Sequence, residues 1–149
     1  MIVSSIMNRT VQSVRPETSV HDIIDLIVQH GFSGVPVVDA QGILVGIVSE
    51  KDILRRLFPS YGEFMEDPVS GMQWDLTGMK KGEVEGLLAR EVMTTTLVTV
   101  EEKTETIKAC ALMTARRVRR LPVVDQSGRL TGIVSQGDVF RALLKYATQ

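Results

Sequence analysis

Hydrophobic positions along this chain follow one pattern twice. Residues 6–58 align with residues 92–144 at a constant offset of 86, without a gap, and 18 of the 53 aligned positions are identical. In the first copy, apolar residues recur at helical spacing, at Val20, Ile23, Ile24, Ile27 and Val28. This spacing predicts an amphipathic helix that Ser19 caps and Gly31 ends.

β-branched residues dominate the stretches on either side of this helix. Residues 10–14 are expected to form a short strand, and residues 35–39 and 43–49 a hairpin in which Gly42 adopts a positive φ. A second helix is expected at residues 50–58, with an apolar face formed by Ile53, Leu54 and Leu57. The second copy repeats the scheme with the apolar residues Cys110, Met113, Val139, Phe140 and Leu143.

These elements predict an α+β fold built from two βαββα repeats. A unit of about fifty residues has too small an interior to be stable alone, so we expect the two copies to pack with pseudo-two-fold symmetry and two equivalent clefts. The expected organisation is repeat 1 at residues 1–58, a linker at residues 59–90 and repeat 2 at residues 91–149.

The linker has no counterpart in either repeat. Aromatic residues crowd its beginning, namely Phe58, Tyr61, Phe64 and Trp74. Residues 83–93 are expected to form one short helix. Two interpretations stay open, a cover over the paired sheets or a surface for contact with another protein.

Composition excludes several classes of function. The chain has 149 residues and a net charge of −1, which gives no general attraction to nucleic acid or to an acidic membrane. Its apolar runs are too short to cross a bilayer, and the N-terminus lacks the pattern of a secretory signal. With the single cysteine, Cys110, expected to be a buried thiol, we predict a cytoplasmic protein.

No catalytic or metal centre is expected. His21 and His30 lie at opposite ends of one predicted helix, without a cysteine or another histidine at ligand spacing. The chain also lacks a nucleophile with a matching base and a strict P-loop. We therefore expect no enzyme activity, no metal and no catalytic cofactor.

The most informative motif is a strand that runs into a helix, Gly-Ile-Val-Ser-x-x-Asp, which ends at Asp52 and again at Asp138. A helix N-terminus favours an anion, and a carboxylate one turn into the helix can accept hydrogen bonds from a ribose diol. Ser49 and Asp52 equally resemble a capping box that only completes the start of the helix. Both roles can coexist.

Together with the repeated Pro-Val-Val-Asp strands and the opening Ile6-Met7 and Val92-Met93, these motifs resemble a tandem pair of CBS (cystathionine-β-synthase) domains. The resemblance covers the chain except for the linker. It implies a regulatory adenosine-containing ligand, such as AMP, ADP, ATP or an S-adenosyl compound. It also implies that each site combines the Asp turn of one repeat with strand edges of the other.

The resemblance assigns two candidate sites. Site A comprises Ser49, Lys51, Asp52, Val98, Val118, Arg119 and Arg120. Site B comprises Gln12, Ser33, Gly34, Ser135 and Asp138. Site A is expected to prefer phosphorylated nucleotides because of its cations, and site B to take a ligand without a phosphate cluster or to stay empty.

We therefore predict a stand-alone, non-catalytic ligand sensor that signals through contacts with other chains. A homodimer is expected, formed through the linker aromatics and the second helix of each repeat, with the regulated partner unidentified. One alternative is a structural dimerisation module with empty clefts. Another is a binder of single-stranded nucleic acid, which the cluster Arg116, Arg117, Arg119 and Arg120 would favour.

Overall fold

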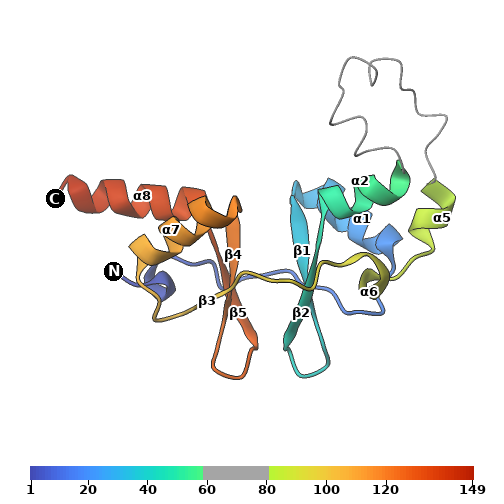
Figure 1. Ribbon diagram of the computed structural model, residues 1–149, viewed down its shortest axis with the longest axis horizontal. Helices are drawn as coiled ribbons and strands as arrows, with labels where there is room; N and C mark the ends of the chain where they lie inside the picture. The colour runs from blue at the N-terminus through green and yellow to red at the C-terminus, as the bar shows by residue number, and fades with distance from the viewer. Residues whose placement is uncertain (59–80) are drawn as a thin grey trace, which may run out of the picture. The chain divides into compact units, whose positions relative to one another are not determined.

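The computed structural model describes residues 1–58 and 81–149 (Figure 1). The structure contains both helices and strands, with an antiparallel hairpin in the second repeat, which confirms the predicted α+β class. The elements are η1 Val3–Ser5, α1 Val20–His30, β1 Gly34–Val38, β2 Leu44–Ser49, α2 Glu50–Leu57, α5 Lys81–Glu85, α6 Ala89–Val92, β3 Val100–Glu101, α7 Thr106–Arg116, β4 Arg120–Val124, β5 Leu130–Ser135 and α8 Gln136–Ala147. The predicted aromatic residues Tyr61, Phe64 and Trp74 lie outside the described residues.

The chain divides into two compact units, and each unit draws on both sequence repeats. The first-repeat unit comprises Ser13–Val37 and Val45–Thr95, and the second-repeat unit comprises Met1–Gln12, Val38–Leu44 and Thr96–Gln149. Equivalent hydrogen bonds attach the exchanged segments. Val3 N–H donates to the Thr104 carbonyl, and Ala89 N–H donates to the Thr18 carbonyl, each at 2.8 Å. The N-terminal segment is therefore part of the second-repeat unit.

Helix α1 begins and ends where the sequence predicts. The Ser19 hydroxyl accepts a hydrogen bond from Asp22 N–H, and Gly31 follows the helix in the left-handed conformation with φ of 67°. Helix α7 ends in the same way at Arg117, whose φ is 54° although it carries a side chain. In both units the two long helices lie on the same side of the sheet (Figure 1).

Each hairpin depends on the aspartate of the repeated Pro-Val-Val-Asp motif. Asp39 Oδ1 accepts hydrogen bonds from the N–H groups of Gln41 and Ile43 at 2.9 and 3.0 Å. Asp125 does the same with Ser127 and Arg129 in the second repeat, both at 2.9 Å. An aspartate that bonds the backbone two residues on stabilises a tight turn, which explains why both copies have it.

The predicted strand at residues 10–14 is wrong except at its last residue. Only Val14 pairs, in a single parallel bridge with Val37, so β1 and β2 form a two-stranded sheet. Arg15 N–H donates a hydrogen bond to the Thr18 hydroxyl, so the pairing does not continue past Val14. In the second repeat β3 is only two residues long, but it completes a three-stranded sheet in the order β3-β4-β5.

The single helix predicted at residues 83–93 is also wrong, because the structure has two short helices there. Between α5 and α6, the Leu87 carbonyl accepts a hydrogen bond from Val20 N–H at 2.8 Å and so completes the start of α1. This contact and the neighbouring Gly86 interrupt the helical path. Val84 is 2% exposed in the core of the first-repeat unit, so this end of the linker is structural.

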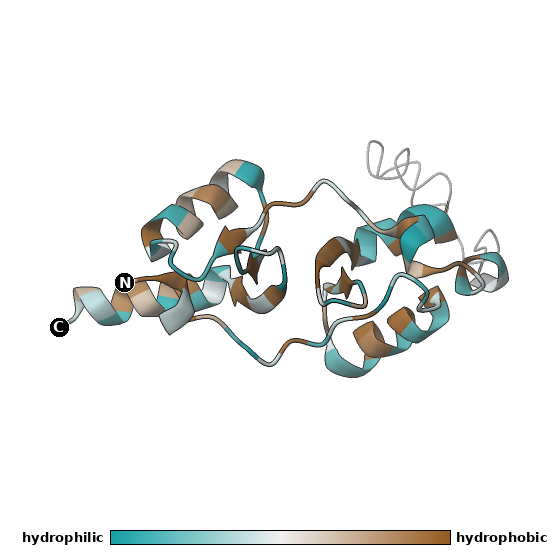
Figure 2. Cartoon of the chain, turned by 90° about the horizontal axis from the view of Figure 1, so that it is seen from below, coloured by the Kyte–Doolittle hydropathy of each residue, from teal (hydrophilic) through white to brown (hydrophobic). Residues whose placement is uncertain are grey.

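Two hydrophobic cores of matching composition stabilise the units. Val14, Val37 and Val48 are buried in the first core, and Val100, Val123 and Val134 occupy the aligned positions of the second core. Hydrophobic residues accordingly line the strands, and hydrophilic residues follow one side of the helices (Figure 2).

The expected apolar face of the last helix is only partly correct. Val139 is 1% exposed, whereas Phe140 is 61% exposed. Consecutive residues of a helix point about 100° apart, so both cannot face one core. The predicted buried thiol of Cys110 is half-buried.

Candidate ligand-binding site

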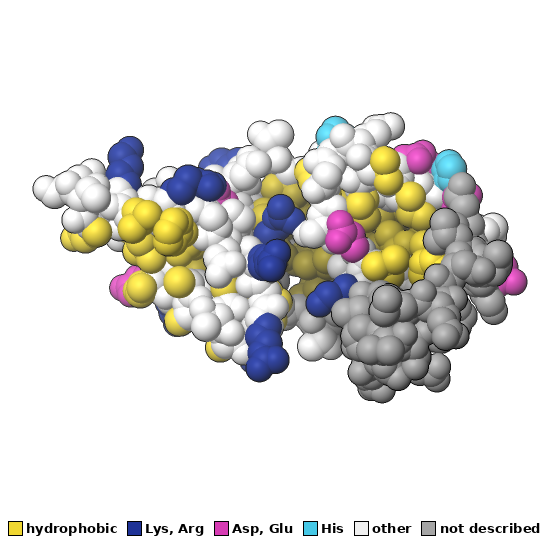
Figure 3. All heavy atoms as spheres, turned by 90° about the horizontal axis from the view of Figure 1, so that it is seen from above, with side chains coloured by type: hydrophobic (Ala, Val, Ile, Leu, Met, Phe, Trp, Pro, Cys, Tyr) yellow, Lys and Arg dark blue, Asp and Glu magenta, His cyan; other side chains and the backbone are white. Residues whose placement is uncertain are grey.

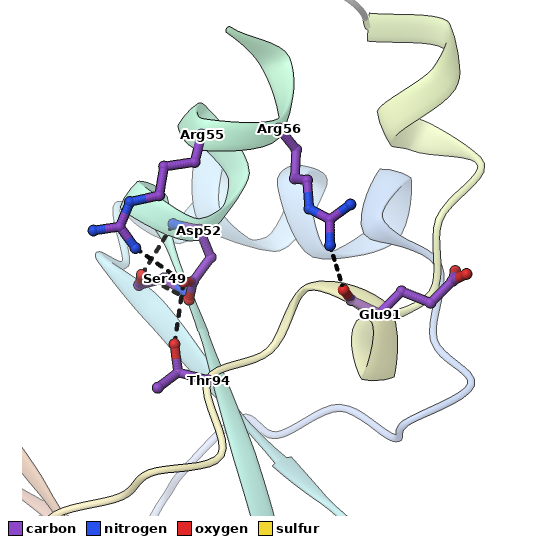
Figure 4. Close-up of polar contacts among 6 residues, drawn as sticks. All are labelled: Ser49, Asp52, Arg55, Arg56, Glu91 and Thr94. Atoms are coloured by element: carbon purple, nitrogen blue, oxygen red, sulfur yellow. Dashed lines mark hydrogen bonds and ion pairs between the residues drawn. The ribbon is translucent and has the colours of Figure 1, made fainter. Parts of the chain in front are cut away.

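The turn between β2 and α2 forms a complete capping box (Figure 4). Asp52 Oδ2 accepts hydrogen bonds from Ser49 N–H and from the Ser49 hydroxyl, each at 2.9 Å. In return, the Ser49 hydroxyl accepts a hydrogen bond from Asp52 N–H at 3.2 Å. The structural role that the motif predicted is therefore present.

The second carboxylate oxygen of Asp52 binds a residue that sequence reasoning missed. Asp52 Oδ1 accepts a hydrogen bond from the Thr94 hydroxyl at 3.1 Å, and the side chain of Asp52 is only 9% exposed. Thr94 is held there because its backbone exchanges two hydrogen bonds with Ile47, at 3.0 and 2.8 Å. The signal in the sequence was its place directly after the repeated Val92-Met93 motif.

The turn between β5 and α8 has the same cap and a different outer partner. Ser135 N–H donates to Asp138 Oδ2 at 2.9 Å, and Asp138 N–H donates to the Ser135 hydroxyl at 3.1 Å. Asp138 Oδ1 forms an ion pair with Arg141 Nη2 at 2.8 Å. Arg141 was missed, although its identity with Arg55 in the other repeat is visible in the alignment.

Ser33 and Gly34 lie beside the Asp turn of their own repeat. The Ser33 carbonyl accepts a hydrogen bond from Glu50 N–H at 2.9 Å. A Cβ atom on Gly34 would lie 2.8 Å from the Val48 carbonyl oxygen, so only glycine allows β1 to approach β2 this closely.

Arg119 and Arg120 hold the equivalent positions in the second-repeat unit. The Arg119 carbonyl accepts a hydrogen bond from Gln136 N–H at 2.8 Å, at the start of α8. Arg120 is the first residue of β4 and lies opposite Ser135 in the register. Both arginines are exposed. The structure therefore brings two cationic residues next to the second Asp turn.

The remaining predicted residues differ in burial. Lys51 is exposed in the first turn of α2, and Gln12 is exposed. Val98 and Val118 are half-buried and pack against the core of the second-repeat unit. Predicted sites A and B each take residues from both units, so their complete composition stays a prediction.

Charged groups outside the turns form few close clusters among the described residues. Arg9 forms a 2.9 Å hydrogen bond with Glu102, and this contact holds the pKa of that carboxyl below its usual range. His21, Asp22 and Asp25 have potential metal-ligand atoms within 4.8 Å of one another. All three residues are exposed, an arrangement common in proteins without a bound ion.

A comparison with known families identifies the repeat. The CBS domain model matches residues 3–59 and again residues 89–145, so it accounts for most of the chain. The chain belongs to the CBS domain family. Within the described part of this chain, no helix is long and apolar enough to cross a membrane.

Two relatives show how far this similarity extends. The CBS domain-containing protein CBSX1 of Arabidopsis thaliana, a chloroplastic protein, is 35% identical over 138 residues, which are 89% of this chain and 58% of that protein. An uncharacterised protein of Methanocaldococcus jannaschii, MJ1426, is 31% identical over 97% of this chain and 92% of its own length. The CBS pair thus spans less than two thirds of the plant relatives and nearly all of the archaeal one.

Solved structures of CBS pairs share the fold. CBSX2 in complex with AMP is 31% identical, with a TM-score of 0.75 and coverage of 98% of both chains. The CBS pair of MJ0100, in complex with 5′-methylthioadenosine and S-adenosyl-L-methionine, has a TM-score of 0.69 at 20% identity. At that identity the likeness concerns the fold alone.

Proposed function

We propose that this CBS pair is a non-catalytic regulatory module that binds an adenosine-containing ligand at its two Ser-x-x-Asp turns. The supporting observation is the presence of both turns, with matching geometry, in a chain 31% identical over nearly its full length to CBSX2, which was solved with AMP. The proposal covers the module and not the full activity of the longer plant relatives.

The chemistry of the turns suits a nucleoside. Asp52 presents a carboxylate whose Oδ1 accepts a hydrogen bond from the Thr94 hydroxyl, which shows that this oxygen can receive a hydroxyl donor. A ribose hydroxyl can add to or replace that contact, because a carboxylate oxygen has two lone pairs. The N-terminus of α2 favours the negative charge of a phosphate nearby.

Signalling is proposed to occur through contacts with other chains. Helix α8 begins at the Asp138 turn and carries Phe140 and Leu144, which are 61% and 50% exposed. Hydrophobic side chains gather on this surface of the second-repeat unit, at the left of Figure 3. A ligand at the turn and a partner on this surface would act on the same helix.

The partner proposed for this surface is a second copy of the chain, as the sequence predicts. An exposed apolar helix face favours association in water because burying it removes apolar area from solvent. The regulated protein and the cellular compartment stay predictions.

A structural module without a ligand is the second candidate. Its supporting observation is that both capping boxes are complete within the chain, so neither Asp52 nor Asp138 needs a ligand to stabilise its helix. The two candidates differ in what they predict for AMP binding.

Calorimetric titration of AMP into the full chain tests the proposal. Ribose 5-phosphate and inosine 5′-monophosphate serve as matched controls, because the first lacks the base and the second alters the adenine edge. We expect saturable binding of AMP and weaker binding of both controls. Equal affinities for all three compounds would contradict the recognition of adenosine, and no binding of AMP, S-adenosylmethionine or ATP would support the structural module instead.

A further inference from the structure

Arg141 lies over the start of its own helix. Its Nη2 atom is 2.8 Å from Asp138 Oδ1, one turn earlier in α8. Its Nη1 atom is 3.1 Å from the position that a Cβ atom on Gly137 would occupy. The guanidinium therefore rests where Gly137 has no side chain, directly above the N-terminal turn of α8.

The first repeat has the same arginine in a different arrangement. Arg55 aligns with Arg141, but its Nη1 atom is 4.0 Å from Asp52 Oδ1, beyond hydrogen-bond distance. The Thr94 hydroxyl bonds that oxygen instead. Lys51 aligns with Gly137. The first repeat therefore has a lysine side chain at the position where the second repeat has only a glycine next to the Arg141 guanidinium. Both aspartates thus form an ion pair with an arginine, but the hydrogen bond to Oδ1 comes from a hydroxyl in the first repeat and from a guanidinium in the second.

We propose that Arg141 recognises phosphate at the second Asp turn, next to which Arg119 and Arg120 also lie, and that it makes this turn select phosphorylated adenosine compounds over uncharged ones. The inference rests on the proposed function and deepens it. It also reverses the sequence-based expectation that the second turn lacks a cation and takes ligands without a phosphate cluster.

Geometry and charge support this role. The side chain of Arg141 is 72% exposed, while the Asp138 contact fixes where the guanidinium lies. Guanidinium has five N–H donors, so one bond to Asp138 leaves others for phosphate oxygens. Asp138 Oδ2 caps the helix through Ser135 N–H, which keeps in place the carboxylate that positions Arg141.

The second turn can be tested alone by weakening the first. Asp52→Asn removes the charge of the first turn and retains an amide oxygen for Ser49 N–H. In this background, AMP and adenosine are titrated into the chain with and without Arg141→Gln. We expect Arg141→Gln to weaken AMP binding about ten-fold while adenosine binding stays within about two-fold. The salt dependence of AMP binding should also diminish.

The matched control is the aligned arginine. Arg55→Gln in an Asp138→Asn background removes the same charge from the first turn, where the guanidinium makes no hydrogen bond to the carboxylate. The ratio of AMP affinity to adenosine affinity is expected to change by less than about two-fold there.

The outcomes separate the two proposals. Equal losses of AMP and adenosine binding with Arg141→Gln, or no loss of either, would overturn the role of Arg141 and leave the proposed function intact. A parent chain that binds neither compound at either turn would overturn both. Circular dichroism of each variant distinguishes lost binding from lost folding.

Discussion

Thr106 occupies in the second core the position that Val20 occupies in the first. Both residues begin the long helix of their repeat, and they are 1% and 0% exposed. The Thr106 hydroxyl is buried and has no hydrogen-bond partner among the described residues. Otherwise similar sites thus bury a methyl group in one repeat and a hydroxyl in the other.

Thr106→Val is expected to raise the free energy of unfolding by about 1–2 kcal/mol, because the shape is retained and the cost of burying a hydroxyl without a partner is removed. Urea denaturation of the variant and the parent chain measures the change. Val20→Thr is the matched control and should lower stability by a similar amount. A stability loss in Thr106→Val would mean that the hydroxyl has a partner.

Arg117 gives a second prediction from the same comparison. It holds a left-handed conformation at the end of α7, with φ of 54°, where the first repeat has Gly31. Arg117→Gly should stabilise the chain by about 0.5–1 kcal/mol, since relief of backbone strain exceeds the extra entropy of glycine in the unfolded chain.

Gly31→Ala is the matched control for Arg117→Gly. A Cβ atom at Gly31 would meet nothing within 4 Å, so only the backbone conformation is affected. It should destabilise the chain by about 1 kcal/mol. Thermal unfolding of the two variants checks both values, and a lower melting temperature for Arg117→Gly would contradict the assignment of strain.

The sequence predicted most of this fold because its signals are local and repeated. Helix α1 was predicted with its cap and its final glycine, and the hairpin was predicted with the positive φ at Gly42, observed at 81°. The failures lie where a distant partner decides the structure. Residues 10–14 have the composition of a strand but pair only at Val14, and Leu87 leaves the helical path to accept a hydrogen bond from Val20 N–H at the start of α1.

The candidate site shows the same division. Ser49 and Asp52 are linked within one turn, so their spacing alone predicts their contact. Thr94 lies 42 residues from Asp52, and only the backbone pairing with Ile47 brings it there. Arg141 was overlooked although it lies within the motif's own helix, three residues after Asp138, a spacing at which helical side chains can pair.

The ion pair between Arg9 and Glu102 predicts a pH effect. Its hydrogen bond lowers the pKa of Glu102 in the folded chain, so the stabilisation is present above the unfolded pKa and is lost as pH falls through the folded pKa. Arg9→Gln should raise the pKa of Glu102 and reduce the loss of stability in acid. NMR titration of the Glu102 carboxyl measures this, with Arg15→Gln as a control. An unchanged pKa in Arg9→Gln would contradict the assignment.

If two copies of the chain associate through α8, replacing its exposed apolar residues should halve the molar mass of the particle in solution. Replacing both Phe140 and Leu144 with serine should convert a dimer into a monomer, because the exposed apolar face of the helix is lost. Val28→Ser removes an apolar residue from α1 that is even more exposed, at 76%, and should leave the dimer intact. Light scattering at micromolar concentration distinguishes these states, and a monomeric parent chain would contradict the proposal.

The most direct test of ligand binding at the Asp turns is calorimetric titration of AMP into the parent chain and into the double variant Asp52→Ala/Asp138→Ala. Asp125→Ala, which removes a hairpin aspartate instead, serves as control. We predict that the double variant binds AMP about ten- to a hundred-fold more weakly, because charge-assisted hydrogen bonds to ribose are lost. Unchanged AMP affinity together with a lower melting temperature would show that the aspartates only cap their helices.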